Sequence, residues 1–229
     1  MKQIAKPGIE PINQLRRRLA LAFGGLAVPA AALTMTAAAA ERPLDMTMET
    51  HAAFFSTETG QPKPLDPQVF VRDAKAQATT GPQHIDHAAG FRPALIADAA
   101  GTQLFNAQGK SLGFSLGQWL GARGKVQVAA DGRTVTVRLS GLRPKGTYSL
   151  FENHFDRQPI GFTPLDGSAT TNTFTAGPDG KASTTVKVPE PMTHANAVLL
   201  VYHSDDQAHG ESRGTIGVDA HHQLIARVP

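Results

Sequence analysis

The sequence of 229 residues contains no cysteine. This absence excludes disulfides, thiolate metal sites and cysteine nucleophiles. Aromatic residues make up only 6% of the chain, with one tryptophan and two tyrosines, and no phosphate-binding loop, dinucleotide-binding fingerprint, calcium loop or internal repeat occurs. The fold must therefore be held by core packing alone, and any metal site must use histidine or carboxylate ligands.

The first forty residues have the order of an export signal. Arg16, Arg17 and Arg18 precede an apolar run that ends in small residues around Ala38 and Ala40. This pattern is typical of a signal peptide cleaved after residue 40, with a retained membrane anchor as the less favoured alternative. The arginines also resemble a twin-arginine signal, so the Sec route is favoured and the twin-arginine route stays open. We expect a periplasmic or secreted protein that is free of the membrane after cleavage.

The chain has no excess of positive charge once this leader is set aside. The leader holds five of the 22 basic residues and one of the 19 acidic residues, so the remaining chain has a net charge near −1. Such a balance gives no electrostatic reason to bind nucleic acid or an anionic membrane. The expected partner is an unidentified protein or small molecule outside the cytoplasm.

The pattern of apolar residues predicts an all-β fold in two parts. Residues 41–93 are rich in glycine and proline and weak in periodicity, which predicts a mostly irregular N-terminal arm with one helical turn near 66–75. Residues 94–229 alternate apolar and polar side chains in short segments. That alternation predicts an antiparallel β-sandwich or Greek-key barrel of seven to eight strands.

Three local patterns carry most of this prediction. Asp131-Gly132 and the Gly-Pro-Asp-Gly run at 177–180 each lie between two alternating segments, which predicts two hairpins. The strand pairs expected for them are residues 125–129 with 134–139, and residues 170–176 with 182–188. The continuous apolar run 197–202 predicts a strand that is buried on both faces.

A family resemblance runs through this β region. The segments that carry it are Gly141-Leu142, Thr147 to His154, Phe174 to Ala182, Leu200 to His203 with Asp205-Asp206, and Gly214 to Val218. In order and spacing, residues 125–218 resemble the copper/zinc superoxide dismutase sandwich and the related CHRD-type domains. The resemblance implies that His203 matches a copper-binding histidine and that His154 lies near the copper-binding His-x-His pair. Glu152 stands where the other histidine of that pair is expected, and the zinc-binding loop has no match.

Two functions are compatible with these observations. The first is a binding or interaction module without turnover, which displays the loops 152–167 and 204–213. The second is a histidine-based copper or zinc protein with a degraded dismutase-like site, because neutral imidazoles bind both metals well. Its candidate ligands are His154, His203 and His209, with Asp205 and His222 as further ligands.

The same residues allow other assignments. In the simplest one, His154 and His203 only cap strands by hydrogen bonding, and His221-His222 forms a solvated turn before the last strand. A Ser-His-Asp hydrolase is disfavoured, because adjacent residues such as His203 and Ser204 point to opposite faces of a strand and no Gly-x-Ser-x-Gly elbow is present. Whether the protein is an enzyme stays open, with no catalytic motif to favour it.

Overall fold

The computed structural model describes residues 44–229, so the expected leader lies outside the described residues. The helical elements are α1 (His51–Thr59), the 3₁₀ turn η1 (Pro82–His84) and α2 (Leu116–Gly121). The strands are β1 (Leu44–Thr50), β2 (Leu65–Arg72), β3 (Thr79–Thr80), β4 (Asp86–His87), β5 (Phe91–Leu95), β6 (Gln103–Phe105), β7 (Ser111–Ser115), β8 (Arg123–Val128), β9 (Thr134–Ser140), β10 (Thr147–His154), β11 (Gly161–Pro164), β12 (Thr173–Thr175), β13 (Ala182–Lys187), β14 (Asn196–His203) and β15 (Ala220–Arg227). Across residues 44–229, neither helix has the length and hydropathy needed to traverse a lipid bilayer.

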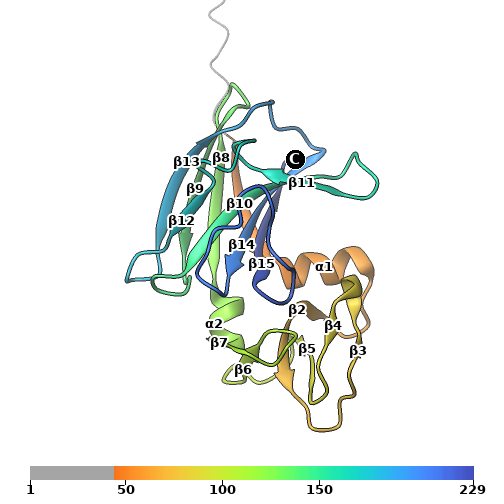
Figure 1. Ribbon diagram of the computed structural model, residues 1–229. Coiled ribbons are helices and arrows are strands. Elements are labelled where there is room, and N and C mark those ends of the chain that lie inside the picture. The colour runs from red at the N-terminus through yellow and green to blue at the C-terminus, as the bar shows by residue number, and fades with distance from the viewer. Residues whose placement is uncertain (1–43) are drawn as a thin grey trace, which may run out of the picture. The chain divides into compact units, whose positions relative to one another are not determined.

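A curled antiparallel sheet of nine strands forms the larger part of the fold (Figure 1). Its order is β11-β10-β14-β15-β1-β8-β9-β13, and β12 pairs with β10 on the same side as β11. The β9–β10 and β12–β13 connections both link opposite ends of this order, and they bond to each other. Leu142 N–H donates to the Gly180 carbonyl at 3.0 Å, and Ala176 N–H donates to the Gly146 carbonyl at 3.0 Å. These bonds hold the curl, and the all-β antiparallel fold expected from the sequence is confirmed.

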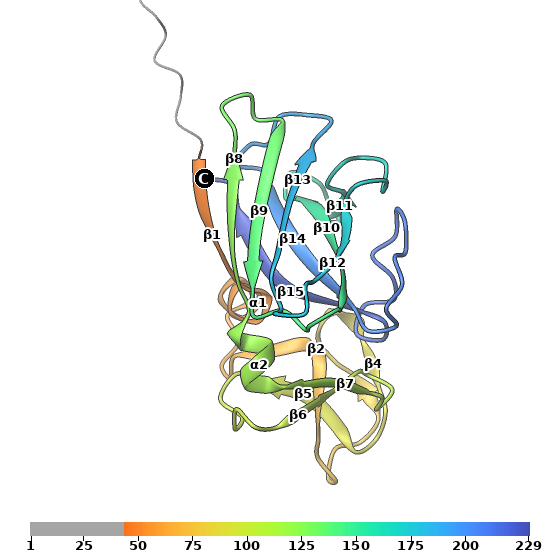
Figure 2. The ribbon, with the colours of Figure 1, turned by 90° about the vertical axis from the view of Figure 1, so that its left-hand side faces the viewer.

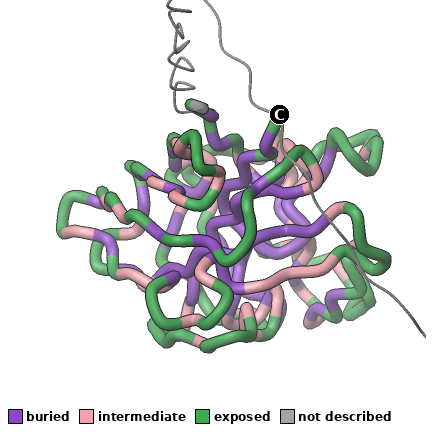
Figure 3. The backbone as a smooth tube through the Cα atoms, turned by 90° about the horizontal axis from the view of Figure 1, so that it is seen from above, coloured by how far each residue is buried: buried purple, intermediate pink, exposed green. Residues whose placement is uncertain are grey.

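The main hydrophobic core fills the concave side of this sheet. Alternate residues of its strands point inward, as Val126 of β8, Val137 of β9 and Leu200 of β14 do, and all three are fully buried. The other face of β14 is covered as well, because Leu199 and Val201 pack in a second cluster with Phe54 of α1. The expected burial of this strand on both faces is therefore confirmed. Seen along the sheet, buried segments occupy the centre and exposed loops surround them (Figure 3).

One predicted hairpin is confirmed and the other pairs differently. Strands β8 and β9 form the first, with Val126 opposite Val137 and Gly132 in the turn at φ +66°. Strands β12 and β13 also exist, but β12 pairs with β10 while β13 pairs with β9. The Gly-Pro-Asp-Gly turn is thus a crossover between sheet edges. Turn residues specify a reversal of the chain, and they do not specify which strands pair on either side of it.

Residues 44–93 correct the expectation of a mostly irregular arm. Strand β1 lies inside the main sheet between β15 and β8, and α1 follows it directly. The segment expected to contain a helical turn is instead strand β2. The breakers that suggested disorder are accommodated by the fold: Pro67 lies at a register irregularity of β2, and Pro93 lies in the edge strand β5.

A second sheet, in the order β5-β2-β6-β7, packs against the end of the first (Figures 1 and 2). The contact between the two sheets contains a buried polar seam. Gln68 of β2 accepts the His222 backbone N–H with its side-chain oxygen at 2.6 Å, and its backbone carbonyl lies 2.9 Å from His221 Nδ1. Asp66 of β2 accepts the indole N–H of Trp119 at 2.8 Å. His221 and His222 therefore lie inside β15 and are buried, which corrects the expectation of a solvated turn.

Candidate functional site

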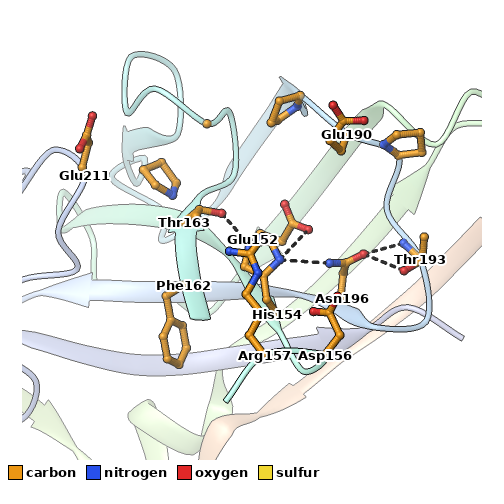
Figure 4. A pocket seen from close by; sticks show the side chains of 14 residues that line it. Glu152, His154, Asp156, Arg157, Phe162, Thr163, Glu190, Thr193, Asn196 and Glu211 are labelled. Carbon is orange, nitrogen blue, oxygen red and sulfur yellow. Dashed lines mark hydrogen bonds and ion pairs between the residues drawn. The ribbon is translucent and has the colours of Figure 1, made fainter. Parts of the chain in front are cut away.

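An open cleft of about 580 Å³ lies where β10, β11 and the segment before β14 meet (Figure 4). Glu152 and His154 are two residues apart on β10, so their side chains leave the same face of the strand. Thr163 of β11 is paired with Glu152 across the ladder and points to that face too. The cleft therefore belongs to the polar loop 152–167 that the sequence analysis singled out.

His154 is held by neighbours on both of its ring nitrogens. Its Nε2 lies 2.8 Å from Thr163 Oγ1, and its Nδ1 lies 3.5 Å from Asn196 Nδ2. The Asn196 side-chain oxygen accepts the Thr193 backbone N–H at 2.7 Å, which turns the amide nitrogen toward His154. His154 Nδ1 is then an acceptor, and Nε2–H donates to Thr163.

Glu152 is the buried carboxylate of the cleft. Its side chain is 9% exposed, and its nearest polar contact is His154 Nδ1 at 3.6 Å from Oε1, beyond hydrogen-bond distance. Among residues 44–229 no group donates a hydrogen bond to it. Burial raises the pKa of Glu152, helped by Asp156 and opposed by Arg157, while burial and Arg157 lower the pKa of His154. Both shifts favour the neutral forms of the two side chains. A neutral His154 gives Glu152 no positive charge, so the carboxylate lacks the cationic partner that a buried carboxylate normally has.

The remaining walls of the cleft are acidic and partly apolar. Four carboxylates line it against a single arginine, Arg157. The acidic residues are Glu152, Asp156, Glu190 and Glu211. Phe162 and three prolines supply the apolar surface. The lining of the cleft therefore contains more acidic than basic side chains.

A second group of polar residues lies at the opposite end of β10 and β14. His209 Nε2 lies 3.2 Å from Asp205 Oδ2 and 3.9 Å from Asp219 Oδ1. One ligand atom from each of these three residues falls within 4.8 Å of the other two. Their side chains are 24–28% exposed, so the group is open to solvent. The part of the chain described here thus contains a convergent set of histidine and aspartate side chains.

His203 adjoins this group from the end of β14. Its ring centroid lies 5.1 Å from that of His209, and its Nε2 lies 2.8 Å from Ser149 Oγ on β10. The residue is fully buried, and its Nδ1 has no hydrogen-bond partner among the described residues. Burial lowers the pKa of His203 to about 4, with the neighbouring His209 as a smaller cause. The ring is therefore neutral at physiological pH.

The structure does not bring all the expected metal ligands together. His203, His209 and Asp205 are neighbours, but His154 is paired with Asn196 at the far end of β14. Seven residues of strand separate these ends, or about 23 Å at the usual rise. His222 faces the seam, where Gln68 Nε2 lies 3.1 Å from its Nδ1 and Arg213 Nη1 lies 3.0 Å from its Nε2.

Sequence reasoning missed two residues of these sites. Asp219 gave no signal, because it follows a turn with a single bridge from Ile216 to Ala220, and only that turn brings it to His209. Asn196, which orients His154, gave no signal because its role depends on the pairing of β10 with β14. The signal that did identify Asp205 and His209 was the polar loop that follows a buried strand.

No protein-family model, no curated protein and no solved structure matches this chain. The class that the fold and the two sites define is an all-β domain with a ligand-sized acidic cleft and a separate histidine–aspartate group. The likeness to the copper/zinc superoxide dismutase sandwich stays a prediction.

Proposed function

We propose that this protein is an exported binding module whose cleft between β10 and β11 binds a small organic cation. The observation that carries the proposal is Glu152, a carboxylate that is nine-tenths buried, lines the cleft and receives no hydrogen bond within residues 44–229. The carboxylate is reached from the open cleft, so its hydrogen-bonding capacity is left for solvent or a ligand. A ligand ammonium group supplies both the donor and the compensating charge.

The charge of the surrounding surface supports a cationic ligand. Asp156, Glu190 and Glu211 add three further carboxylates to the lining, and Arg157 is its one arginine. Glu190 is already paired with Arg133 at 3.0 Å and is largely exposed, so it contributes mainly a weak, screened field at the rim. Glu152 is therefore the anchor, and the outer acids attract the ligand toward it.

The size and walls of the cleft support a small molecule. A volume of about 580 Å³ lies within the usual range of ligand pockets, roughly 300–1,000 Å³. Phe162 and the prolines at positions 164, 189 and 191 offer apolar contacts for the carbon skeleton of an alkylamine. Phe162 is half-buried, and because the Arg213 guanidinium already lies over its ring at 3.4 Å from the centroid, it offers the ligand apolar surface only.

The hydrogen bonds of the cleft favour binding over turnover. A nucleophilic Thr163 requires His154 Nε2 to accept its hydroxyl proton. The Asn196 amide instead faces Nδ1, which leaves the ring proton on Nε2 pointing at Thr163. The proposed location outside the cytoplasm follows from the leader and agrees with a domain that contains no cysteine.

The test is calorimetric titration of the purified protein with 1,4-diaminobutane, and with butanedioate as the anionic counterpart of the same length. We expect binding of the diamine only, and a loss of tenfold or more in affinity for Glu152→Gln, about the value of one charge-assisted hydrogen bond. The matched control is Glu190→Gln, which removes the same charge from an exposed, already paired position and should change affinity less than threefold.

Two results contradict the proposal. One is equal binding of the diamine and the diacid, and the other is an unchanged diamine affinity in Glu152→Gln. Circular dichroism and thermal melting of the variant establish that it is folded. If it is not, Glu152→Asp provides the second test, because the shorter side chain keeps the charge but withdraws it from the cleft and should weaken the diamine about threefold or more.

A further inference from the structure

We propose that Asp205, His209 and Asp219 bind one divalent transition-metal ion, at the opposite end of β10 and β14 from the cleft. This site goes beyond the proposed ligand-binding function and does not depend on it. It also differs from the site expected from the sequence, because it includes Asp219 and leaves out His154 and His222.

The convergence of the three side chains is the first support. His209 Nε2 lies 3.2 Å from Asp205 Oδ2 and 3.9 Å from Asp219 Oδ1, and all three ligand atoms fit within 4.8 Å. Ligand atoms at about 2.0–2.2 Å from a tetrahedral zinc ion are separated by roughly 3.3 Å. The 3.2 Å separation already matches this geometry, the 3.9 Å separation exceeds it by about 0.6 Å, and the third lies within 4.8 Å, so the carboxylates need to move by up to about 1.5 Å.

His203 is the second, independent support. It is fully buried, its Nε2 is occupied by Ser149 Oγ at 2.8 Å, and its Nδ1 has no partner within residues 44–229. A buried nitrogen without a partner is rare in proteins. This ring packs beside His209, at 5.1 Å between centroids. This unpartnered nitrogen is shielded from solvent and belongs to the ring that packs on His209, so it places an unsatisfied polar atom beside the proposed ligands.

Gly214 lies directly against the proposed ligands, and its lack of a side chain leaves the space that they occupy. Gly214 has φ +88°, and a Cβ there would lie 2.5 Å from Asp219 Oδ1 and 3.1 Å from His209 Cδ2. Any side chain at 214 therefore collides with two of the three proposed ligands. The Thr215 backbone N–H donates to Asp219 Oδ1 at 2.6 Å, which fixes the carboxylate next to His209.

The ligand set indicates the class of metal. One imidazole and two carboxylates suit Zn²⁺ and its first-row neighbours, whereas Mg²⁺ and Ca²⁺ prefer oxygen ligands alone. Three protein ligands leave a coordination position for water, the pattern of an open zinc site. The partial exposure of the three side chains lets the ion reach them from solvent.

The experiment is calorimetric titration of Zn²⁺ into the full chain after dialysis against chelator. We expect one ion per chain, with affinity reduced tenfold or more in both Asp219→Asn and Asp205→Asn. The controls are His154→Ala and His194→Ala; His194 is exposed, and His154 lies at the other end of the strands. Both controls should bind zinc as the parent chain does.

The proposal is overturned if the parent chain binds no Zn²⁺, or if neither aspartate variant loses affinity. A loss of zinc in His154→Ala equal to that in Asp219→Asn also overturns it, because that result places the ion elsewhere. Asp205 lies in a surface loop, so Asp205→Asn should fold. This variant keeps the test valid if Asp219→Asn does not fold. None of these outcomes depends on binding of the diamine, so the two proposals are separable.

Discussion

The two ends of strands β10 and β14 each carry histidine beside carboxylate, but in different surroundings. At the cleft, Glu152 and His154 project from a rigid strand, are 9% and 11% exposed, and stay 3.6 Å apart. At the other end, Asp205 and His209 lie in a loop, are 28% and 24% exposed, and approach to 3.2 Å. The buried pair is placed by the ladder and lacks a partner for its carboxylate. In the loop pair the two side chains are already in contact, and Asp219 lies nearby as a third candidate ligand. The same residue types therefore suit an organic cation at one end and a metal ion at the other.

The largest expected difference between the two ends is in stability. In metal-free protein, His203→Ala should lower the free energy of unfolding by about 2–4 kcal/mol, because it empties a fully buried position and removes one of the two hydrogen-bond partners of Ser149 Oγ, leaving only Thr173. His154→Ala should cost about 1 kcal/mol, since water from the open cleft can replace the ring. Urea unfolding of both variants measures this, and equal losses would remove the contrast between the two ends.

A smaller effect is expected from the glycines of the loop before β15. Gly214→Ala should lower the free energy of unfolding by about 1–3 kcal/mol and weaken zinc binding tenfold or more, because the new methyl group meets Asp219 and His209. Gly210→Ala is the matched control: its φ is also positive, at +61°, but nothing lies within 4 Å of the added Cβ. It should cost about 1 kcal/mol through backbone strain alone and leave zinc affinity unchanged. Equal zinc loss in both variants would contradict the steric argument.

The pH dependence of stability tests the buried carboxylate. The pKa of Glu152 is raised in the folded protein, so the folded state binds its proton more tightly than the unfolded state does. Stability from this group is fully present below its ordinary pKa of 4.5 and is lost as the pH rises through the folded value. Glu152→Gln should therefore gain stability relative to the parent chain between pH 4 and pH 8. Denaturant unfolding across that range measures the gain, and a pH-independent difference argues against the burial of this charge.

The smallest expected effect is that of salt. Raising the ionic strength from about 0.05 to 0.5 M should weaken diamine binding about fivefold, because the outer carboxylates act through a screened field. Zinc affinity should change less, because it rests on direct bonds to ligand atoms. Titrations at both salt concentrations measure the two responses. An identical response would indicate that both ligands bind through the same diffuse electrostatic attraction.

The features of the fold that were predicted correctly are the local ones. The β8–β9 hairpin carries its own turn and its own partner, and the apolar run of β14 is buried whatever its neighbours are. Strand β1 was missed although Met46 and Met48 alternate with polar residues. It finds its partners in β8 and β15, far along the chain, and surrounding glycine and proline concealed the short pattern.

The candidate site was predicted in part for the same reason. Asp205 and His209 are four residues apart in one loop, so the sequence places them together. His154 was grouped with His203 because the resemblance to the dismutase sandwich implies that both lie near copper, but β10 and β14 are antiparallel and the two histidines lie at opposite ends of the pair. The local apolar pattern does not reveal which strands pair over such a distance, and Asp219 likewise reaches His209 only through the turn before β15.

The position of β15 has a consequence for the order in which the molecule is made. It is the last strand of the chain, and it lies in the interior of the main sheet between β14 and β1, the first strand described. Until residue 227 has been synthesised, β14 and β1 each present an unpaired edge, and the sheet cannot close. Synthesis and folding are thus separated in time. Long-range pairing of this kind is slow, and the two unpaired edges stay open to other strands until β15 has formed.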